Sequence, residues 1–505
     1  LRRSRGLGDV YKRQVYLLMI PSRCNLTILS WVVTLAIPID SASDVTEARE
    51  SCLSNSINFK SLELSFISKT NRHHIIKDSV ILSVITVEIK VFTDNQAIFG
   101  ANCSCVLSPD ISLEMHMSDK RKFSTNAVHA GTKHIEGAVN TPIFQSSTYQ
   151  LTDERYAGWA AGAQHTLLYA RLSSVNSAAV VEKICALEGA EDGELFASGM
   201  AAISTTLMGL LSQGDHIVAS SDVYGGTYGL MTEELPRFGI STTMADMQDP
   251  ASYEAAIQEN TKILYIETIT NPVIKICDIE AMAKIAKKHD LLLVIDNTFA
   301  SPWGCQPIAM GADLVIHSTT KYLGGHSDII GGAVVGKADL IAAMFIKKVH
   351  FGGSPDPHNC YLLERGIRTL AARMPIHCSN AAEMAKRLEA HDLVELVHHP
   401  SLESHRDYEL AKRIVPKGTG MIAFTVKGGD AAALKFMRGL EVIFEATSLG
   451  GVESLIECPF NSSHMFIPED VRIAAGLGPG FVRISVGIED IEDLWSDISN
   501  ALASI

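Results

Sequence analysis

Positive charge is scarce in this 505-residue sequence. Its 43 lysines and arginines are outnumbered by 57 aspartates and glutamates, which gives a formal net charge of -14. Proteins that bind nucleic acid through its phosphates need a basic surface. Neither a zinc-finger spacing nor an RNA-binding signature occurs. We therefore expect no nucleic-acid partner.

Paired cysteines and long apolar runs are also missing. The ten cysteines are scattered, and Cys103 and Cys105 stand too close together to read as a zinc pair. Scattered cysteines in so long a chain are typical of reduced proteins of the cytosol. We therefore expect a cytoplasmic protein without a disulfide framework or a metal ion. The apolar run at residues 26–39 is shorter than the roughly 20 residues of a membrane span.

Residues 1–116 differ in pattern from the rest of the chain. The chain begins with Leu1, and residues 1–14 resemble translated adaptor sequence. Residues 40–114 show no sustained period, although residues 80–92 could form a strand. We interpret residues 1–116 as a leader that is non-native or disordered, so that the protein proper begins at Met115 or Met117. A genuine targeting extension is the alternative.

Residues 117–178 have few periodic apolar runs and are rich in Gly, Ser, Thr and Asn. Such a segment buries too little surface to be stable alone. We therefore expect an extended arm that packs on a neighbouring subunit. From residue 178 to residue 187 the spacing becomes helical, and Gly189 should end that helix.

Short apolar runs then alternate with amphipathic helices. The runs of strand length are residues 216–219, 263–266, 291–295, 314–316 and 332–335. Residues 251–258 and 279–289 have helical spacing. Near-continuous apolar strands separated by helices predict an α/β fold with a mostly parallel sheet covered on both faces. In such a sheet the ligand site lies beyond the carboxyl ends of the strands.

Three successive runs are followed by polar side chains. In chain order these are Glu267 with Asn271, Asp296, and Ser318 with Thr320 and Lys321. A single charged strand end would be unremarkable, and Lys321 alone reads best as a solvated loop lysine. Three charged ends at one edge of a sheet indicate a site, because buried charges need partners or a function.

These groups suit a cofactor that carries an aldehyde, a ring nitrogen and a phosphate. Lys321 is an amine that burial can make nucleophilic, and Asp296 can keep a pyridine nitrogen protonated. Residues 197–202 open an apolar helix, whose first N–H groups could bind phosphate. A plain helix start is the alternative there. The glycines at 324, 325, 331 and 332 lack the order of a dinucleotide fingerprint.

From Thr125 to the C-terminus the sequence resembles the pyridoxal-phosphate enzymes of cysteine and methionine metabolism. The matching motifs are YAR at 169–171, SGMAA at 198–202, DVYGGT at 222–227, ETITNP at 267–272, DNT at 296–298, STTKYLGGHSD at 318–328, SLGGVESL at 448–455 and RISVGIED at 483–490. The resemblance implies the PLP-dependent transferase fold (fold type I). It also implies a cofactor-binding domain at 179–370 and a C-terminal domain at 371–505 that binds the substrate carboxylate.

The resemblance also implies roles for the residues around the cofactor ring. Lys321 would hold pyridoxal phosphate covalently and later carry protons. Asp296 would pair with the pyridine nitrogen, and Asn271 would bond the phenolic oxygen. Tyr224 would stack on the ring and act as an acid on the leaving group.

The implied phosphate ligands come from two subunits. Those of the same subunit are Gly199, Met200, Ser318 and Thr320. Tyr169 and Arg171 would reach the phosphate from a neighbouring subunit, which implies a homotetramer built of two active dimers. Arg483 would bind the substrate carboxylate as a bidentate pair, helped by Ser448.

Three departures from the family pattern bear on the site. Ser174, Val175 and Asn176 stand where Asn-Pro-Thr is usual, which puts that loop in doubt. Gly226 stands where methionine γ-lyases carry a reactive cysteine. Thr447 stands where many animal and fungal cystathionine γ-lyases carry a glutamate for the distal amino group of cystathionine.

The resemblance favours γ-elimination of cystathionine to cysteine, 2-oxobutanoate and ammonia. Cystathionine γ-synthase and O-acylhomoserine sulfhydrylase activities are alternatives, and methionine γ-lyase activity is a more distant one. An aminotransferase, or a cofactor-binding protein without activity, would represent other classes. An inactive homologue should have lost Lys321 or Asp296, and the chain keeps both.

Overall fold

The computed structural model describes residues 121–161, 166–459, 473 and 476–505, together with four strands nearer the N-terminus. The chain forms two compact units, Leu1–Met115 and His116–Ile505. In the first unit the strands are β1 (Glu63–Ile67), β2 (His73–Lys77), β3 (Val80–Thr93) and β4 (Gln96–Val106). The other three all pair with β3, antiparallel to it. The strand expected at 80–92 is therefore present. Apart from these four strands, the expected leader, including the run at 26–39, lies outside the described residues, and its interpretation as non-native or disordered stays a prediction.

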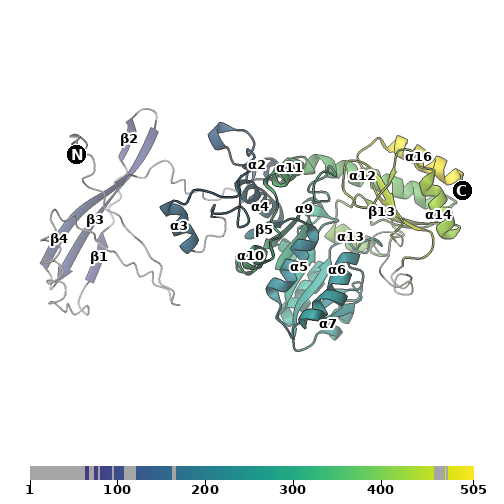
Figure 1. Cartoon of the computed structure of the whole chain (residues 1–505), viewed down its shortest axis with the longest axis horizontal. Coiled ribbons are helices and arrows are strands. Elements are labelled where there is room, and N and C mark those ends of the chain that lie inside the picture. The colour runs from purple at the N-terminus through teal and green to yellow at the C-terminus, as the bar shows by residue number, and fades with distance from the viewer. Residues whose placement is uncertain are drawn as a thin grey trace, which may run out of the picture. The chain divides into compact units, whose positions relative to one another are not determined.

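The second unit is built on a seven-stranded sheet (Figure 1). Its strands are β5 (Asp192–Phe196), β6 (His216–Ser220), β7 (Ser241–Ala245), β8 (Thr261–Glu267), β9 (Leu292–Asp296), β10 (Leu314–Ser318) and β11 (Gly332–Gly336). The order is β5-β11-β10-β9-β8-β6-β7. Within this sheet β11 runs antiparallel to its neighbours β5 and β10, whereas the pairs from β10 to β7 are parallel. All five predicted runs are strands, which confirms the α/β fold.

Helices cover both faces of this sheet, and further helices pack on a second sheet described below. The described helices are α2 (Phe123–His129), α3 (Asp153–Ala160), α4 (Val175–Glu188), α5 (Gly199–Leu210), α6 (Gly225–Gly229), α7 (Pro250–Ala256), α8 (Ile279–Lys288), α9 (Ser301–Gly304), α10 (Ala338–Phe351), α11 (Pro357–Arg368), α12 (Leu370–Glu389), α13 (Tyr408–Ile414), α14 (Gly429–Arg438) and α16 (Ile491–Ala503), with the short turns η3 (Ile135–Gly137), η4 (Leu230–Glu234), η5 (Leu235–Phe238) and η6 (Pro307–Met310).

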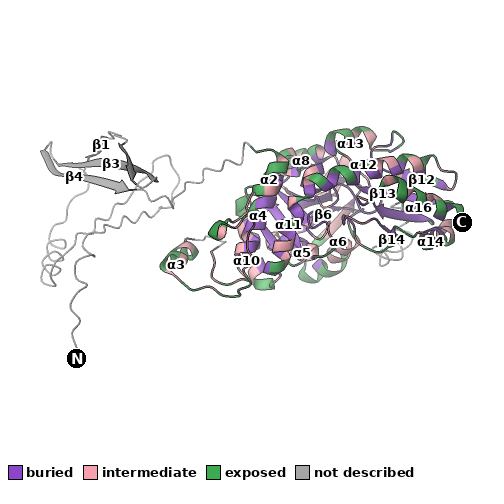
Figure 2. Cartoon of the chain, turned by 90° about the horizontal axis from the view of Figure 1, so that it is seen from above, coloured by how far each residue is buried: buried purple, intermediate pink, exposed green. Residues whose placement is uncertain are grey.

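Alternate residues of each strand point to opposite faces of the sheet, so one apolar run contributes side chains to the hydrophobic cores on both faces. In β8, Ile263 and Tyr265 pack with α5 and α10, whereas Leu264 and Ile266 pack with α4 and α8. Figure 2 shows the buried residues on the strands and on the inner sides of the helices. This two-sided burial explains why the strands read as unbroken apolar runs.

A second sheet follows nearer the C-terminus. Its strands are β12 (Val394–His398), β13 (Met421–Val426), β14 (Phe444–Glu445), β15 (Leu455–Glu457) and β16 (Phe481–Ser485), in the order β12-β13-β16-β15-β14. All neighbours are antiparallel except β14 and β15. Apolar residues of α12, α14 and α16 complete its core. The smaller α/β domain is thus present in outline, while the boundary between residues 370 and 371 stays a prediction.

The segment expected to be an arm holds α2, η3 and α3 and is otherwise irregular. It ends where Ser174 caps α4 in a reciprocal pair of hydrogen bonds with Ser177. Asn176 accepts a hydrogen bond from Phe144 N and donates one to Pro142 O, both at 2.9 Å. The unusual Ser-Val-Asn sequence therefore forms an ordered helix start. As predicted, that helix ends at Gly189, which has φ 74°.

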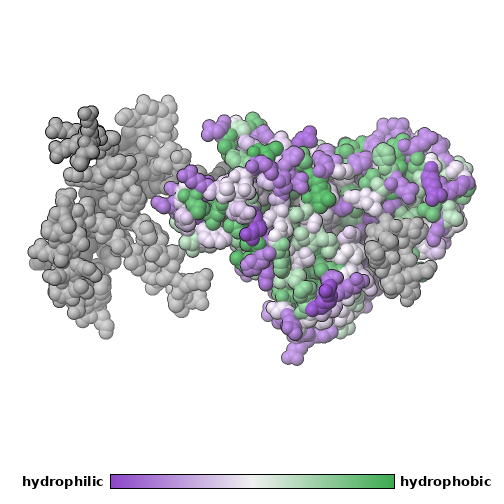
Figure 3. All heavy atoms as spheres, in the orientation of Figure 1, coloured by the Kyte–Doolittle hydropathy of each residue, from purple (hydrophilic) through white to green (hydrophobic). Residues whose placement is uncertain are grey.

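No helix in the described ranges is both long enough and apolar enough to cross a membrane. On the face drawn in Figure 3, hydrophobic and hydrophilic residues of the described part are mixed.

Candidate active site

The three polar strand ends lie side by side. In the parallel pairing of β8 with β9, Glu267 is the partner of Asp296, and in that of β9 with β10, Asp296 is the partner of Ile316. Lys321 follows three residues after the end of β10. The sequence prediction that these ends share one edge of the sheet is therefore confirmed.

Lys321 provides the amine at this edge of the sheet, and it is bound by a serine that lies between β14 and β15 of the second sheet. Its Nζ donates a hydrogen bond to Ser448 Oγ at 2.7 Å. Burial, and the nearby positive charge of Arg483, lower the pKa of Lys321 to about 8. Ser448 has φ +90°, a conformation that costs a non-glycine residue about 1–3 kcal/mol. Such local strain is commonly found at functional sites.

Arg483 lies on β16 with its side chain almost fully buried. Its Nη1 donates to Asn271 Oδ1 at 2.6 Å, and its Nη2 donates to the backbone carbonyl of Ser448 at 2.9 Å. Nη2 also lies 2.6 Å from Glu457 Oε1. The predicted residues Lys321, Asn271, Ser448 and Arg483 thus form one connected cluster.

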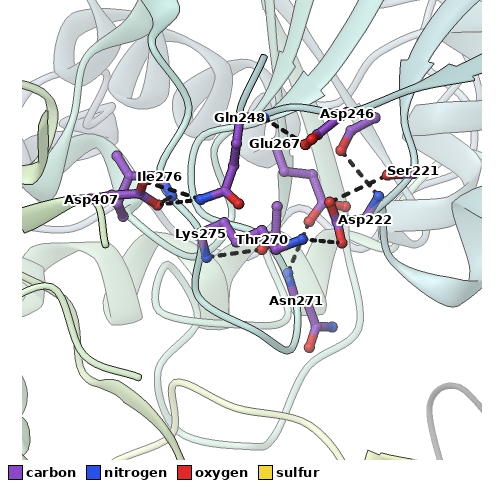
Figure 4. Close-up of polar contacts among 11 residues, drawn as sticks. Ser221, Asp222, Asp246, Gln248, Glu267, Thr270, Asn271, Lys275, Ile276 and Asp407 are labelled. Atoms are coloured by element: carbon purple, nitrogen blue, oxygen red, sulfur yellow. Dashed lines mark hydrogen bonds and ion pairs between the residues drawn. The ribbon is translucent and has the colours of Figure 1, made fainter. Parts of the chain in front are cut away.

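Glu267 holds two of the predicted residues by their backbones. Its carboxylate accepts hydrogen bonds from Tyr224 N at 2.6 Å and from Asn271 N at 3.3 Å. Figure 4 shows Glu267 beside the loop that carries Asn271. Burial raises the pKa of Glu267, and the carboxylate of Asp296 raises it further. The Tyr224 side chain itself is 39% exposed.

The loop after Asn271 is held from the C-terminal side of the chain. Asp407 accepts from Ile276 N at 3.0 Å and from Gln248 Nε2 at 3.1 Å (Figure 4). His405 Nδ1 accepts from Asp407 N at 3.1 Å, so its Nε2 carries the hydrogen that it donates to Ile274 O at 3.1 Å. Burial lowers the pKa of His405 and so favours the neutral ring.

Asp296 is a buried carboxylate at the end of β9. Its Oδ1 accepts from Thr298 N at 3.0 Å and from Thr298 Oγ1 at 2.5 Å. Burial raises the pKa of Asp296, although the Thr298 hydrogen bonds oppose that effect. A buried carboxylate of this kind gains from a cationic partner, and a protonated pyridine nitrogen is one.

Two of the predicted phosphate ligands, Gly199 and Ser318, lie next to each other. Ser318 N donates to Thr298 Oγ1, the hydroxyl that also bonds Asp296. A Cβ atom on Gly199 would stand 2.9 Å from Ser318 Oγ, so only glycine lets the start of α5 approach the end of β10 so closely. Thr320 Oγ1 exchanges hydrogen bonds with Gly331 N at 3.0 Å and Gly331 O at 3.3 Å. N–H groups at a helix start, next to hydroxyls and glycine, are suited to phosphate. The donor set therefore fits pyridoxal phosphate.

Tyr169 and Arg171 lie elsewhere. Arg171 Nη1 donates to Val349 O at 2.6 Å, and its guanidinium lies 5.6 Å from the centre of the Tyr169 ring. Both side chains are exposed. In the described part of this single chain, neither residue has a hydrogen bond to the Lys321 cluster. Their assignment to a neighbouring subunit's site stays a prediction.

Two buried groups beside the site were missed at the level of sequence. Glu457 ends the run Leu455-Ile456, and an acid at the end of a buried run is the signal that could have revealed it. His317 Nε2 lies 2.7 Å from Glu188 Oε1, with both side chains buried, and Asn297 Nδ2 donates to the same oxygen at 2.9 Å. This second group lies behind the strand ends and supports the loop that begins with Asn297.

The fold and the donor set thus define an α/β protein built to bind pyridoxal phosphate at the carboxyl ends of its parallel strands. The family model described as Cys/Met metabolism PLP-dependent enzyme matches residues 124–503. The chain belongs to this family, and it is a pyridoxal-phosphate-dependent enzyme of cysteine and methionine metabolism.

Several relatives are similar to this chain over nearly their whole length. The chain is 43% identical over 391 residues to a cystathionine γ-lyase of Bacillus subtilis, covering 76% of this chain and 100% of the relative. It is 41% identical over 388 residues to an L-methionine γ-lyase of Porphyromonas gingivalis, covering 76% and 97%. A cystathionine β-lyase of Lactococcus lactis is 42% identical over 384 residues, with 75% and 98% covered.

A solved structure agrees with the fold. The crystal structure of cystathionine γ-lyase from Lactobacillus plantarum complexed with L-serine superposes with a TM-score of 0.72 at 40% identity, covering 76% of this chain and 99% of that one.

Proposed function

We propose that the protein cleaves the γ-carbon–sulfur bond of cystathionine, taking up water and releasing cysteine, 2-oxobutanoate and ammonia. The observation that carries this proposal is the meeting of an amine and a guanidinium at one serine. Ser448 accepts from Lys321 Nζ through Oγ and from Arg483 Nη2 through its backbone carbonyl. An amino acid bound by its carboxylate at Arg483 would thus present Cα near the Lys321 amine.

Each group of the cluster has a task in this reaction. Pyridoxal phosphate, when bound, supplies a sink for the negative charge that develops at Cα. Lys321 would remove the proton from Cα, pass that proton on to the electron sink so that its amine is neutral again, and then remove one from Cβ; a pKa of about 8 suits it to proton transfer near neutral pH. Arg483 and Ser448 hold the carboxylate, and Tyr224 donates a proton to the departing sulfur.

We also propose that the active protein is a homotetramer of two active dimers. The arm exposes large apolar side chains, among them Val139 at 75% and Tyr156 at 57%. Tyr169 and Arg171 lie on the same arm. An arm that exposes apolar area and carries two predicted phosphate ligands is suited to cover the site of a second copy.

We keep a cytoplasmic location as a proposal. Disulfides persist in oxidising compartments. The cysteines described without a disulfide are Cys185, Cys277, Cys305, Cys360 and Cys378. Thiols of this kind are compatible with a reducing compartment.

The alternative activities differ in the bond that is broken or formed. A γ-synthase or sulfhydrylase would replace the γ-substituent with a thiol, and a methionine γ-lyase would release a small thiol. The relative from Porphyromonas gingivalis supports the methionine reading. Gly226 counts against it, because methionine γ-lyases carry a reactive cysteine at that position. A Cβ there would stand 2.6 Å from Tyr224 Cε1, so a cysteine would require the Tyr224 ring to move.

Product identity tests the proposal. Purified protein with added pyridoxal phosphate should be offered cystathionine, cysteine, homocysteine, methionine and O-acylhomoserine in turn, with the products identified by mass. We expect cysteine and 2-oxobutanoate from cystathionine. Homocysteine and pyruvate would instead show β-elimination, and a requirement for an added thiol would show γ-replacement. A Lys321→Ala variant provides the control for reactions that do not depend on the site.

A further inference from the structure

Arg483 has a buried counter-ion on the neighbouring strand. Glu457 on β15 is the direct register partner of Arg483 on β16. Their charged atoms, Oε1 and Nη2, are 2.6 Å apart, and the two side chains are only 4% and 3% exposed. This acid is not among the residues that the family motifs assign to the site.

The guanidinium is held at both of its terminal nitrogens, while its inner nitrogen has no partner among the described residues. A guanidinium has five N–H donors. Three of the four on Nη1 and Nη2 have acceptors in Asn271 Oδ1, the carbonyl of Ser448 and the carboxylate of Glu457. In contrast, Nε is buried and has no hydrogen-bond partner within the described ranges. A buried donor without a partner is rare and costly, so an unpaired Nε indicates a place that a ligand completes.

We propose that Glu457 is a positioning residue for the substrate carboxylate. It holds Nη2 from the neighbouring strand β15, which fixes the guanidinium in the place where it would meet the substrate carboxylate. It also balances the charge of Arg483 before a substrate arrives, since an unpaired buried charge is strongly destabilising. The inference rests on the proposed function, in which Arg483 receives the carboxylate.

Two conservative variants separate the length of the Glu457 side chain from its charge, because the two properties have opposite effects on carboxylate binding. Glu457→Gln keeps the length of the side chain and an oxygen acceptor for Nη2, but it removes a negative charge that repels an incoming carboxylate. Glu457→Asp keeps the charge but withdraws the carboxylate by one methylene, so the guanidinium is no longer held. If positioning is the role, the Gln variant should bind carboxylates as well as the wild type does, and the Asp variant should bind them worse.

The experiment uses the holoenzyme and two probes of equal size, butanoate and uncharged butanamide. Binding is measured as the probe-induced shift in Tm and as the inhibition constant against cystathionine. We expect the inhibition constant of butanoate to rise about tenfold in Glu457→Asp, as for a displaced charge partner. In Glu457→Gln it should stay within about threefold of the wild-type value or fall. Butanamide should bind equally to all three proteins.

Asp497→Asn is the matched control. Asp497 is also a buried acid of the C-terminal region, but it accepts hydrogen bonds from the backbone N–H groups of residues 441–443. This variant should lose stability without changing the ratio of butanoate to butanamide binding. The same pattern in Glu457→Asp would mean that Glu457 only stabilises the fold.

The inference is overturned if Glu457→Asp binds butanoate normally, or if Glu457→Gln loses as much binding as Glu457→Asp. Wild-type protein that does not respond to butanoate at all would instead contradict the role of Arg483 and the proposed function with it. A responsive wild type with unchanged variants contradicts only the role of Glu457.

Discussion

The amine of Lys321 donates a hydrogen bond to the hydroxyl of Ser448 across a sequence separation of 127 residues. The serine sits at φ +90°, where a glycine would be unstrained. A serine kept in a glycine conformation suggests that its hydroxyl, and not its backbone, is what the position requires.

Two variants at Ser448 separate these contributions. Ser448→Ala and Ser448→Gly both remove the hydroxyl, and we expect kcat/KM for cystathionine to fall by about tenfold to a hundredfold, as for a lost hydrogen bond to a charged group. Ser448→Gly should be more stable than Ser448→Ala by about 1 kcal/mol, because only glycine relieves the strain. Steady-state kinetics and urea unfolding measure the two effects. Equal stability of the variants would remove the argument from strain.

The lowered pKa of Lys321 predicts how the apoprotein takes up its cofactor. The amine attacks an aldehyde only when neutral, so the rate of pyridoxal phosphate uptake should rise with pH and level off above about pH 8. A lysine with the ordinary value of 10.5 would still gain reactivity far above that pH. Stopped-flow absorbance of the apoprotein across this range provides the measurement.

Arg483→Leu provides the control for this pH profile. The positive charge of Arg483 lowers the pKa of Lys321, so its removal should move the midpoint of the profile to higher pH. A profile that stays in place, or moves to lower pH, would contradict this electrostatic coupling.

The crowding around Gly226 predicts the effect of a side chain there. In Gly226→Cys the new Cβ would stand 2.6 Å from Tyr224 Cε1 and 3.1 Å from Met200 Sδ, so the Tyr224 ring must move. We expect kcat for cystathionine to fall by about tenfold or more, as for a displaced acid. Nothing lies within 4 Å of a Cβ on Gly229 in the same helix, so Gly229→Ala should keep wild-type kcat. Unchanged kcat in Gly226→Cys would argue against a role for Tyr224.

The proposed exchange of residues between subunits can be tested by mixing. Arg171→Ala and Lys321→Ala homo-oligomers should each be nearly inactive. The two variants are then mixed in equal amounts so that subunits pair at random. If Arg171 serves a neighbouring site, each mixed dimer has one intact site, which combines Lys321 of one subunit with Arg171 of the other. About a quarter of the wild-type sites per subunit should then be active. Activity that stays at the level of the separate variants would place Arg171 and Lys321 at the same subunit's site.

The strands of the sheet could be predicted from the sequence because strands buried on both faces are continuous apolar runs. The runs at 216–219, 263–266 and 314–316 all became strands that extend one to three residues further. The direction of β11 could not be predicted, since the apolar run at 332–335 reads the same in a parallel or an antiparallel strand. The pairing partners of β11 depend on contacts far along the chain.

Site residues that follow strands of the first sheet, such as Asp296 and Lys321, could be predicted from the sequence. Site residues contributed by the second sheet were harder to predict. Arg483 and Ser448 entered through the family motifs alone, and Glu457 escaped notice because an acid after an apolar run is usually a solvated strand end. Its burial depends on pairing with β16, which local sequence does not encode.

The support that His405 and Asp407 give to the loop after Asn271 has a consequence for biosynthesis. A nascent chain that has emerged only as far as residue 390 contains Lys321, Asp296 and Asn271, yet it lacks the two residues that fix the Asn271 loop. It lacks Ser448 and Arg483 as well. Contacts over such long separations form late. The mostly parallel sheet can therefore assemble during translation, whereas a site able to retain its cofactor arises only once the chain has been made as far as Arg483.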